Sequence, residues 1–402
     1  MNSKISVHHI GGRAGSRAFP ILRSFEKDII NVLYDADKDC IEGIKEANRN
    51  HESELYVFPY CFSSEVSSSK LNINYDPYTS SLYKFNPYYN GHYFFNMDHD
   101  YIFGEVCKPM VERSVDLVTI DHMFRDMPDF PKPDFLSLDT QGSEWDILNG
   151  ARETLKNSVL AVALEVEFHS IYQGQKLFGD ISGLLSSLGF QFVKFDYLGI
   201  SSPYRAPVGL RGEGFQTYGE AFFLKRIENI ESENKIDNFL MFQKMAFIAI
   251  VNNQFEYGLK CLERSKDINR QYSIFEQLKN VPEYCKFLSE LEKQIMKMPQ
   301  HFPPTFAEKY TFETSKARFD TVEKQRSYAY SIKLCIKKIP GLIKVVRPGL
   351  IKVDRMAKRL IHFKYIKRYS NVEKVLVRYN LIAQAKILMK NRIIQSRCIK
   401  SF

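Results

Sequence analysis

The chain has 402 residues, more than one compact domain usually holds, and 44% of them are hydrophobic, so we expect two or three folded units with a sizeable core. Its seven cysteines are widely spaced and form no CxxC pair, which argues against a disulfide framework or a zinc site and favours a reducing compartment. The sequence shows no apolar segment of a secretory signal and no apolar run near the roughly 18–20 residues of a membrane-spanning helix, so we expect a cytoplasmic protein.

The net charge of +9 is unevenly distributed along the chain. Residues 331–402 contain 19 Lys and Arg against two acids, a charge of +17, so the first 330 residues carry 9 − 17 = −8. A basic tail suits an anionic partner, and one hypothesis is peripheral contact with the inner face of an anionic membrane. The alternative is a helical face exposed to solvent. We expect no nucleic-acid partner, because no recognisable RNA or DNA module accompanies the charge.

Strands and helices are expected to alternate up to about Arg226. Short apolar segments predict strands over 4–10, 29–34, 55–60, 135–138, 159–168, 191–195 and 220–225. Helices are predicted over 17–27, 37–50, 145–156 and 178–188. This alternation is typical of βαβ units and a mostly parallel sheet, and such sheets bind ligands outside the carboxyl ends of their strands.

The strand signals stop after Arg226. Apolar residues at helical spacing over 239–249 and 255–262 predict a helical hairpin with a turn at Asn252 and Asn253, and a further helix is predicted over 282–298. We therefore predict four parts, which are an α/β domain over 1–226, a helical region over 227–298, a linker with a helix over 299–330 and a basic amphipathic helical tail over 331–402.

Glycines and an acid follow the first two predicted strands. The sequence HHIGGRAG places Gly11 and Gly15 in a turn where a ligand can approach the backbone closely, although a plain tight turn would have the same residues. Asp35 ends the second strand about 20 residues later, where a carboxylate can accept both hydroxyls of a ribose. Its alternative role is that of an acid at a helix N-terminus. Together the turn and the acid favour a nucleoside-bearing cofactor.

Two further apolar strands end in carboxylates. In PDFLSLDTQGSEWDIL, Asp139 ends a strand and Glu144 opens a helix, so both belong to the carboxyl edge of the sheet unless they serve only as a helix cap and a helix N-terminal acid. In ALEVEFHS, Glu165 and Glu167 point to one face of a strand, and His169 follows. We interpret this as a functional edge, with a structural, hydrogen-bonded histidine as the alternative for His169.

These motifs together resemble the FkbM-type methyltransferases. The resemblance covers about residues 3–226 and is carried by VDLVTID (115–121), FLSLDTQGSEWDILNGARETL (135–155) and ALEVEFHSIYQGQKLFGDI (163–181), with HIGGRAG, LYDAD and PYTSSLY (77–83) upstream. It implies an α/β fold with a Rossmann-like class I methyltransferase sheet of seven strands, mostly parallel with the last antiparallel, followed here by an all-α C-terminal region. It also implies S-adenosylmethionine as the methyl donor and a hydroxyl of a sugar, glycan or glycolipid as the acceptor.

The resemblance assigns roles by position. Gly11 and Gly15 match glycines near the methionine part of the donor, and Asp35 matches the ribose-binding acid. Asp139 matches the acid beside donor and acceptor, and His9 stands where the family usually has an acid that holds the donor's amino group. The other residues expected on the cofactor side match characteristic polar residues of the family, namely Gln141, Glu144 and Glu165.

Methyl transfer to a hydroxyl requires alignment of donor and acceptor, and removal of the hydroxyl proton adds roughly 10²–10⁴-fold in rate. We expect Asp139 as the catalytic base, with His169 and Glu167 as alternatives, and no metal ion. The aromatic residues over 75–103 are expected either to bind a glycan acceptor or to fill a local core under a long loop. The loop over 199–219 is a second candidate lid.

Two other functions stay open. A histidine at position 9 is compatible with a catalytically weak or inactive donor-binding scaffold whose tail binds a membrane or a partner. A nicotinamide-dependent sugar oxidoreductase would use a similar Gly-rich sheet, but GGRAGSR does not match GxGxxG and no Tyr-x-x-x-Lys pair is recognisable. The sequence predicts no oligomeric state.

Overall fold

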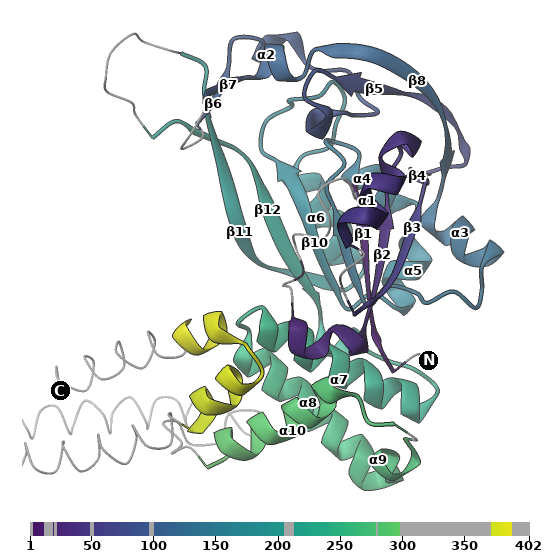
Figure 1. Ribbon diagram of the computed structural model, residues 1–402, viewed down its shortest axis with the longest axis vertical. Helices are drawn as coiled ribbons and strands as arrows, with labels where there is room; N and C mark the ends of the chain where they lie inside the picture. Colours follow the sequence, from purple (N-terminus) through teal and green to yellow (C-terminus); the bar gives the residue numbers. More distant parts are fainter. Residues whose placement is uncertain are drawn as a thin grey trace, which may run out of the picture. The chain divides into compact units, whose positions relative to one another are not determined.

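The computed structural model describes residues 3–11, 19, 22–48, 52–95, 100–204, 213–278, 280–297 and 371–387 (Figure 1). They belong to two compact units, Met1–Leu288 and Ser289–Phe402. Gly15, the predicted linker, the middle of the loop over 199–219 and most of the predicted basic tail lie outside the described residues. The first unit continues past Arg226, and a domain boundary at that residue stays a prediction.

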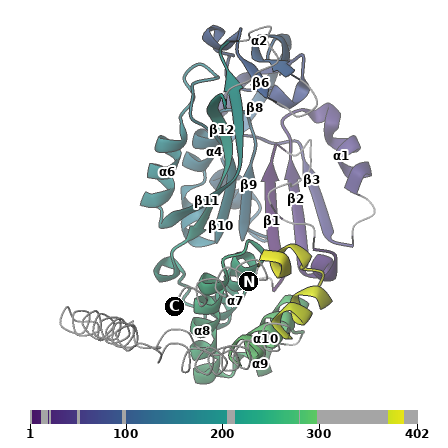
Figure 2. The same ribbon diagram turned by 90° about the vertical axis from the view of Figure 1, so that its left-hand side faces the viewer.

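A mixed sheet of nine strands forms the centre of the first unit (Figures 1 and 2). Its order is β3-β2-β1-β9-β10-β12-β11-β6-β7. The first five strands of this order pair in parallel, and β12 is antiparallel to both of its neighbours. The strands are β1 (Ile5–Ile10), β2 (Ile29–Tyr34), β3 (Glu54–Phe58), β6 (Tyr93–Phe95), β7 (Asp100–Ile102), β9 (Phe135–Leu138), β10 (Ala161–Glu167), β11 (Phe190–Ser202) and β12 (Phe215–Lys225).

Strands occur at all seven predicted positions, but the sheet also contains two strands that the sequence did not predict. The two additional strands, β6 and β7, come from the aromatic segment and are three residues long, too short to show an alternating pattern. They extend the sheet beyond β11 as antiparallel strands, so the described strand pairs are divided equally between parallel and antiparallel. The sheet is therefore mixed rather than mostly parallel.

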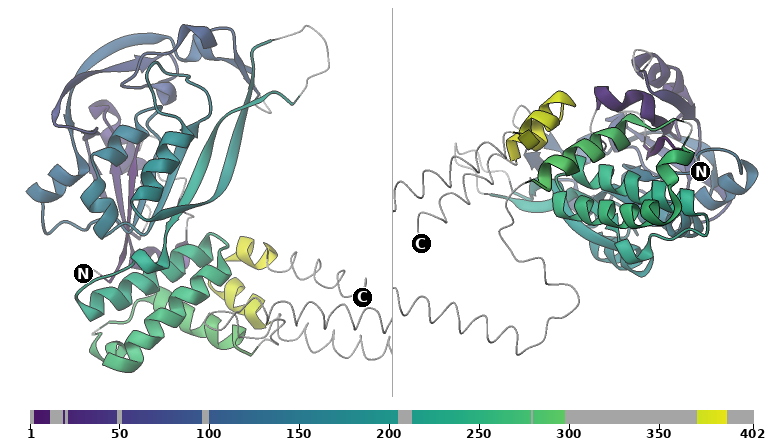
Figure 3. Two further views of the ribbon diagram at one scale, coloured as in Figure 1. Left: turned by 180° about the vertical axis from the view of Figure 1, so that it is seen from behind. Right: turned by 90° about the horizontal axis from the view of Figure 1, so that it is seen from below.

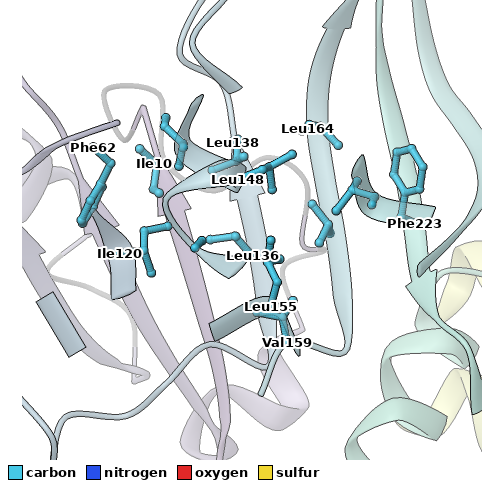
Figure 4. Close-up of a cluster of buried hydrophobic side chains, with 14 of the residues drawn as sticks. Ile10, Phe62, Ile120, Leu136, Leu138, Leu148, Leu155, Val159, Leu164 and Phe223 are labelled. Atoms are coloured by element: carbon cyan, nitrogen blue, oxygen red, sulfur yellow. The ribbon is translucent and has the colours of Figure 1, made fainter. Parts of the chain in front are cut away.

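One face of the sheet is covered by four helices, which begin with α3 (Ile120–Asp126) and end with α6 (Phe178–Ser187). Ile10, Leu138 and Leu164 point to this face and belong to one buried cluster with Leu148 of α4 (Glu144–Asn149) and Leu155 of α5 (Arg152–Asn157) (Figure 4). Each of the five side chains is at most 4% exposed. Full burial of one such side chain contributes about 1.5–3 kcal/mol. The cluster therefore holds the carboxyl ends of the central strands in fixed positions.

A second sheet of three strands has the order β4-β8-β5. Its strands are β4 (Cys61–Phe62), β5 (Ser67–Asn74) and β8 (Pro109–Val118). The sequence did not predict it, because β5 begins with the polar run SSSK and β8 is mostly exposed. Figure 1 shows β5 and β8 beyond the carboxyl ends of β1 and β2, so this sheet lies over the edge where a ligand site is expected.

Helices α7 (Lys235–Val251) and α8 (Phe255–Tyr272) form a helical hairpin at the predicted place (Figures 1 and 3). Residues 239–251 of α7 are all buried. Lys244 of this helix donates from Nζ to both carboxylate oxygens of Asp134, at 3.0 and 2.8 Å, and neither side chain is more than 3% exposed. Since Asp134 directly precedes β9, this buried ion pair joins the hairpin to the beginning of a central strand.

The other helices correct the predicted boundaries. Of the predicted helix over 17–27, residues 23–27 are described as helical, within a 3-10 helix (Arg23–Asp28). The helix predicted over 145–156 is divided into α4 and α5, with Gly150 at the break, where a Cβ atom would lie 2.2 Å from the Ser63 carbonyl oxygen. The remaining bounds are α1 (Ile41–Asn48), α2 (Phe103–Val106), α3 (Ile120–Asp126), α6 (Phe178–Ser187), α9 (Ile274–Gln277) and α10 (Glu283–Ile295), with 3-10 turns at Lys38–Cys40, Pro77–Thr79, Pro87–Tyr89 and Ile227–Asn229.

Every described element after β12 is helical, including residues 371–378 and 382–387. An all-α C-terminal region remains a prediction for 298–370 and 388–402. In the described parts of the chain, no helix is both long enough and apolar enough to cross a membrane.

Candidate active site

Four residues of the predicted site lie in one row across the carboxyl edge of the large sheet. The last residue of β1 is paired with the last residue of β2 on one side and with the last residue of β9 on the other. The last residue of β9 is also paired with a residue near the end of β10. The residues that follow these four positions are Gly11, Asp35, Asp139 and Glu165. The parallel register therefore brings together a glycine and three acids that are far apart in the sequence.

Gly11 permits a close approach between two strand ends. It has φ +92°, and a Cβ atom at this position would lie 1.8 Å from the carbonyl oxygen of Asp139. The amide of Gly11 donates to the Tyr34 carbonyl at 3.0 Å, and the amide of Asp139 donates to the Ile10 carbonyl at 2.9 Å. Both the backbone conformation and the available space thus require a residue without a side chain.

A first cavity lies over this row of residues. It has about 740 Å³ of empty space, including its open mouth. Gly11, Asp35 and Asp139 lie on the side of the large sheet. The remaining wall is mostly apolar and comes largely from the second sheet and its flanking segments, through Tyr60, Cys61, Phe62, Leu71, Ile73, Pro77, Leu82 and Ile147. Acids beside apolar walls suit a ligand with both hydroxyl groups and a flat apolar ring.

Asp35 is oriented by the turn after β2. Its Oδ1 accepts a hydrogen bond from the amide of Asp37 at 2.8 Å, and the residue is 9% exposed. Asp37 in turn accepts from Arg113 of β8 at 2.6 Å, and the same guanidinium pairs with Asp39 at 2.6 Å. Arg113 therefore connects the second sheet to the turn that presents Asp35.

The turn between β9 and α4 is organised by Glu144. Its Oε1 accepts from the amide and the hydroxyl of Thr140, at 2.7 and 2.9 Å, and its Oε2 accepts from the amide of Gly142 at 2.9 Å. The side chain is 1% exposed. Glu144 does not line either cavity among the described residues, so its contacts support a structural role in shaping the turn.

Gln141 is the centre of this turn and adopts a left-handed backbone conformation, with φ +57°. Its Nε2 donates to Asp139 Oδ1 at 3.0 Å and to Glu165 Oε2 at 2.5 Å. Its Oε1 accepts from the Tyr172 hydroxyl at 2.9 Å. The unusual backbone conformation thus places one amide between two carboxylates, and a tyrosine fixes the amide's orientation.

A second cavity adjoins the first. It encloses about 820 Å³ including its mouth, and Gln141 and Tyr78 line both cavities. Glu165 and Glu167 lie in its wall, as expected for alternate residues on one face of β10. The other lining side chains are mainly aromatic: Phe94, Tyr101, Phe103, Tyr172 and Tyr218.

The carboxyl groups of this region perturb one another. Burial raises the pKa of Glu144 to about 7, and the charge of Asp139 contributes to the increase. Burial also raises the pKa of Glu165 and of Glu167 well above the ordinary value, and for both the neighbouring carboxylates add to the effect. Burial and the neighbouring carboxylates thus both disfavour the charged form of these glutamates.

The two histidines of the predicted site lie elsewhere. His9 is 4% exposed, and its ring is hydrogen-bonded to Ser137 Oγ at 2.8 Å and to the Gly11 carbonyl at 3.2 Å. His169 packs against the rings of Tyr89 and Phe215. Neither histidine is among the described residues that line the two cavities.

The aromatic segment over 75–103 contributes both to a cavity wall and to a buried cluster, and binding of a glycan by it stays a prediction. Tyr78, Phe94, Tyr101 and Phe103 line the second cavity, whereas Tyr89 belongs to a small buried cluster beneath it. Phe103 is a member of both groups.

Sequence reasoning missed several lining residues. Tyr172 and Tyr218 contribute to the second cavity, and Leu71 and Ile73 of the second sheet line the first. Tyr172 follows the acidic end of β10 in EVEFHSIY, so proximity to that motif could have identified it. No neighbouring motif could have identified Leu71 and Ile73, since the sequence did not predict the strand that contains them. In the described ranges, no group of three or more His, Cys, Asp or Glu side chains is arranged to hold a metal ion.

The arrangement defines an α/β protein with a cavity at the carboxyl edge of its sheet, where such sheets usually bind ligands. Residues 50–192, about a third of the chain, match the family described as Methyltransferase FkbM domain. Over this segment the chain is similar to the FkbM methyltransferase family. No curated protein matches the chain.

Three solved structures share a low similarity with the chain. They are a methyltransferase FkbM from Methylobacillus flagellatus KT (12% identity, TM-score 0.31, covering 56% of this chain and 44% of that one), the magnesium protoporphyrin IX methyltransferase ChlM from Synechocystis PCC 6803 with bound SAM (10%, 0.28, 56% and 71%) and a TehB-like SAM-dependent methyltransferase from Corynebacterium glutamicum (11%, 0.25, 55% and 80%). The chain thus spans less than half the length of the FkbM structure.

Proposed function

We propose that this protein is an S-adenosylmethionine-dependent methyltransferase that methylates a hydroxyl group of a sugar, glycan or glycolipid precursor. The observation that carries the proposal is the position of Gly11, Asp35 and Asp139, which line one cavity at the ends of three adjacent parallel strands. The family of residues 50–192 supports the reaction class. The acceptor class rests on the family resemblance and on the aromatic and polar lining of the second cavity.

The residues of the first cavity fit this donor. Asp35 would bind the ribose hydroxyls, and the apolar wall that includes Phe62 and Ile73 would contact the adenine ring. His9 would act indirectly, because its hydrogen bonds to Ser137 and to the Gly11 carbonyl support the turn beneath the cavity. Glu144 would also act through the backbone turn that it organises.

Asp139 is the group best placed to accept the hydroxyl proton of the acceptor. When bound, the donor supplies a methyl group on a positively charged sulfur, which a hydroxyl oxygen can displace to leave a neutral thioether. The Asp139 carboxylate is exposed at the first cavity and is oriented by Gln141, the residue shared with the second cavity. Glu167 is a weaker candidate because burial raises its pKa and so disfavours the ionised form that a base requires, and His169 does not line the site.

Titration calorimetry with S-adenosylmethionine and with NAD tests the donor. We expect S-adenosylmethionine to bind and NAD not to bind. Asp35→Asn should weaken donor binding by about 10-fold or more, since a hydrogen bond to a charged group contributes about 1.5–3 kcal/mol. Asp116→Asn, at an exposed position of β8 outside both cavities, is the matched control and should bind the donor normally. Absence of binding at millimolar donor, or preference for NAD, would overturn the proposal.

A methyl-transfer assay separates an enzyme from a donor-binding scaffold. We expect wild-type protein to transfer label from methyl-labelled donor to a glycan fraction, and we expect Asp139→Asn to reduce the rate roughly 10²–10⁴-fold, the usual contribution of a general base. If donor binds but no extract is labelled, the scaffold alternative is favoured.

A cytoplasmic site of action and a role for the basic tail in membrane contact are further parts of the proposal. Removal of residues 331–402 should shift the protein from the membrane fraction to the soluble fraction at physiological salt, because electrostatic attachment depends on the tail's net charge of +17. Unchanged partitioning would exclude this role.

A further inference from the structure

We infer that the second cavity binds an acceptor that carries a protonated amine beside its hydroxyl groups, as an amino sugar does. The inference rests on the proposed function, of which it names the acceptor class. Its basis is a buried carboxyl oxygen that makes no hydrogen bond, the absence of cationic side chains among the described residues that line the cavity, and the position of the aromatic rings.

Glu167 provides one carboxyl oxygen that lacks a hydrogen bond. The side chain is 2% exposed and lies in the wall of the second cavity. Its Oε2 atom makes no hydrogen bond to any of the residues that the structure describes. An oxygen that accepts no hydrogen bond in the protein interior typically lowers stability by about 1–3 kcal/mol, and by more when it is charged. A hydrogen-bond donor on a bound ligand would therefore be stabilised at this position.

The charges around the cavity determine which kind of hydrogen-bond donor a bound ligand would present there. Asp76, Glu165 and Glu167 line the cavity, and none of its described lining residues is Lys, Arg or His. A phosphate or carboxylate on the acceptor would therefore meet carboxyl groups and no cationic side chain among the described lining residues. An ammonium group, by contrast, would favour the ionised form of both glutamates, whose pKa is raised by burial and further by neighbouring carboxylates. A neutral hydroxyl could accept or donate a hydrogen bond here but would not compensate an ionised glutamate.

The aromatic rings fit the same ligand. Phe94 and Tyr218 lie with their ring centroids 5.4 Å apart, and both line the cavity on the same side of the sheet extension as Glu165. Aromatic faces attract cations by about 0.5–2 kcal/mol, and they also contact the apolar face of a sugar ring. Rings combined with carboxylates therefore favour an organic ammonium ion over a neutral sugar.

Gln141 separates this cavity from the donor side. It holds Asp139 and Glu165 apart and lines both cavities, so an acceptor bound near the glutamates would have hydroxyl groups near Asp139. The competing interpretation is that Glu165 and Glu167 bind the amino group of the donor itself. The two interpretations predict different losses when the glutamates are neutralised.

Binding of three probes to the full-length protein tests the inference, with saturating S-adenosylhomocysteine present. The probes are glucosamine, N-acetylglucosamine and glucose 6-phosphate, which present a cation, a neutral amide and an anion on similar rings. We expect glucosamine to bind about 10-fold more tightly than N-acetylglucosamine, as cation–π and ion-pair contacts would give. We expect no binding of glucose 6-phosphate. Equal affinities, or preference for either of the other probes, would overturn the inference.

Isosteric variants locate the effect. Glu167→Gln and Glu165→Gln should each reduce the preference for glucosamine to about 2-fold, while donor affinity changes by less than about 2-fold. Glu105→Gln, at an exposed position of the adjacent α2 that does not line the cavity, should keep the full preference. A preference that survives both glutamate variants, or a loss of donor affinity instead, would overturn the inference. Donor binding without any amino-sugar preference refutes this inference alone, whereas absence of donor binding refutes the proposed function.

Discussion

Gln141 donates its side-chain amide to Glu165 at 2.5 Å and thereby lies between the carboxylate of that residue and the carboxylate of Asp139. The amide can do this only because its residue has φ +57°, a conformation that side-chain-bearing residues rarely adopt. The backbone conformation and the spacing of the two acids are therefore linked.

Gln141→Glu should destabilise the protein more than Gln141→Gly does. Glycine tolerates the left-handed conformation and removes only the side chain, whereas glutamate replaces the shared donor with a third negative charge. We expect the glutamate variant to lose about 1–3 kcal/mol of unfolding free energy relative to the glycine variant at pH 8. Thermal or urea unfolding of both proteins measures this difference. Equal stabilities at pH 8 would show that the amide does not separate the carboxylates.

Gly11→Ala should prevent the two strand ends from meeting. The new methyl group would lie 1.8 Å from a backbone oxygen, which cannot rotate away, and φ +92° is unfavourable for alanine. We expect a loss of more than about 3 kcal/mol, or failure to fold. Gly43→Ala is the control, because a Cβ atom there has no neighbour within 4 Å and the residue lies in α1. That variant should be equally or more stable by up to about 1 kcal/mol. Similar melting temperatures for the two variants would contradict this interpretation.

The stability of the site should decrease as the pH rises. The pKa of Glu144 is about 7 in the folded protein against an ordinary value of 4.5, so the folded state binds more protons than the unfolded state between these values. The stability contributed by this proton is fully present below pH 4.5 and is lost as the pH rises through about 7. Glu167 behaves in the same direction because its pKa is also raised.

Glu167→Gln tests this dependence, since glutamine cannot ionise. The variant should gain stability relative to the wild type between pH 5 and pH 8, by an amount on the order of 1.4 kcal/mol for each unit of the pKa increase that falls within this interval. Urea unfolding at both pH values measures the gain. The exposed Glu105→Gln variant should show no such difference. If the free energy of unfolding of the wild type and of Glu167→Gln changes equally with pH, a raised pKa of Glu167 is contradicted.

Lys244→Met should destabilise the first unit strongly. It would leave the carboxylate of Asp134 in the interior without its cation, a change that typically costs about 3–5 kcal/mol. The double variant Lys244→Met/Asp134→Asn should recover part of the loss, because it removes both buried charges and keeps a side chain that can accept from the Ser6 amide. Urea unfolding of the single and double variants measures the coupling. If the double variant is less stable than Lys244→Met, the uncompensated charge of Asp134 does not explain the loss of stability.

Regular strand patterns made the centre of the fold predictable. Buried strands such as IINVLY and AVALEVE have continuous apolar segments, and the acids at their ends follow from the register of parallel strands. That register places Asp35 and Asp139 on one cavity, as the sequence suggested.

The second sheet could not be predicted in the same way. Most of β8 and the beginning of β5 are exposed, and the pairing of Ser67 with Leu117 joins residues 50 positions apart that carry no mutual signal in one sequence. Long-range packing also decided the role of His9, since its contact with Ser137 depends on the pairing of β1 with β9. The sequence alone could not show that this histidine faces a neighbouring strand.

The buried contact between Lys244 and Asp134 has a consequence for how the protein can be divided. A chain shortened at Arg226 would retain every residue of the row at the sheet edge, yet it would leave one interior charge uncompensated and uncover Phe25, whose ring packs on Phe247. The hairpin is thus a permanent part of the fold that supports the chemistry, and a minimal active fragment has to extend through it.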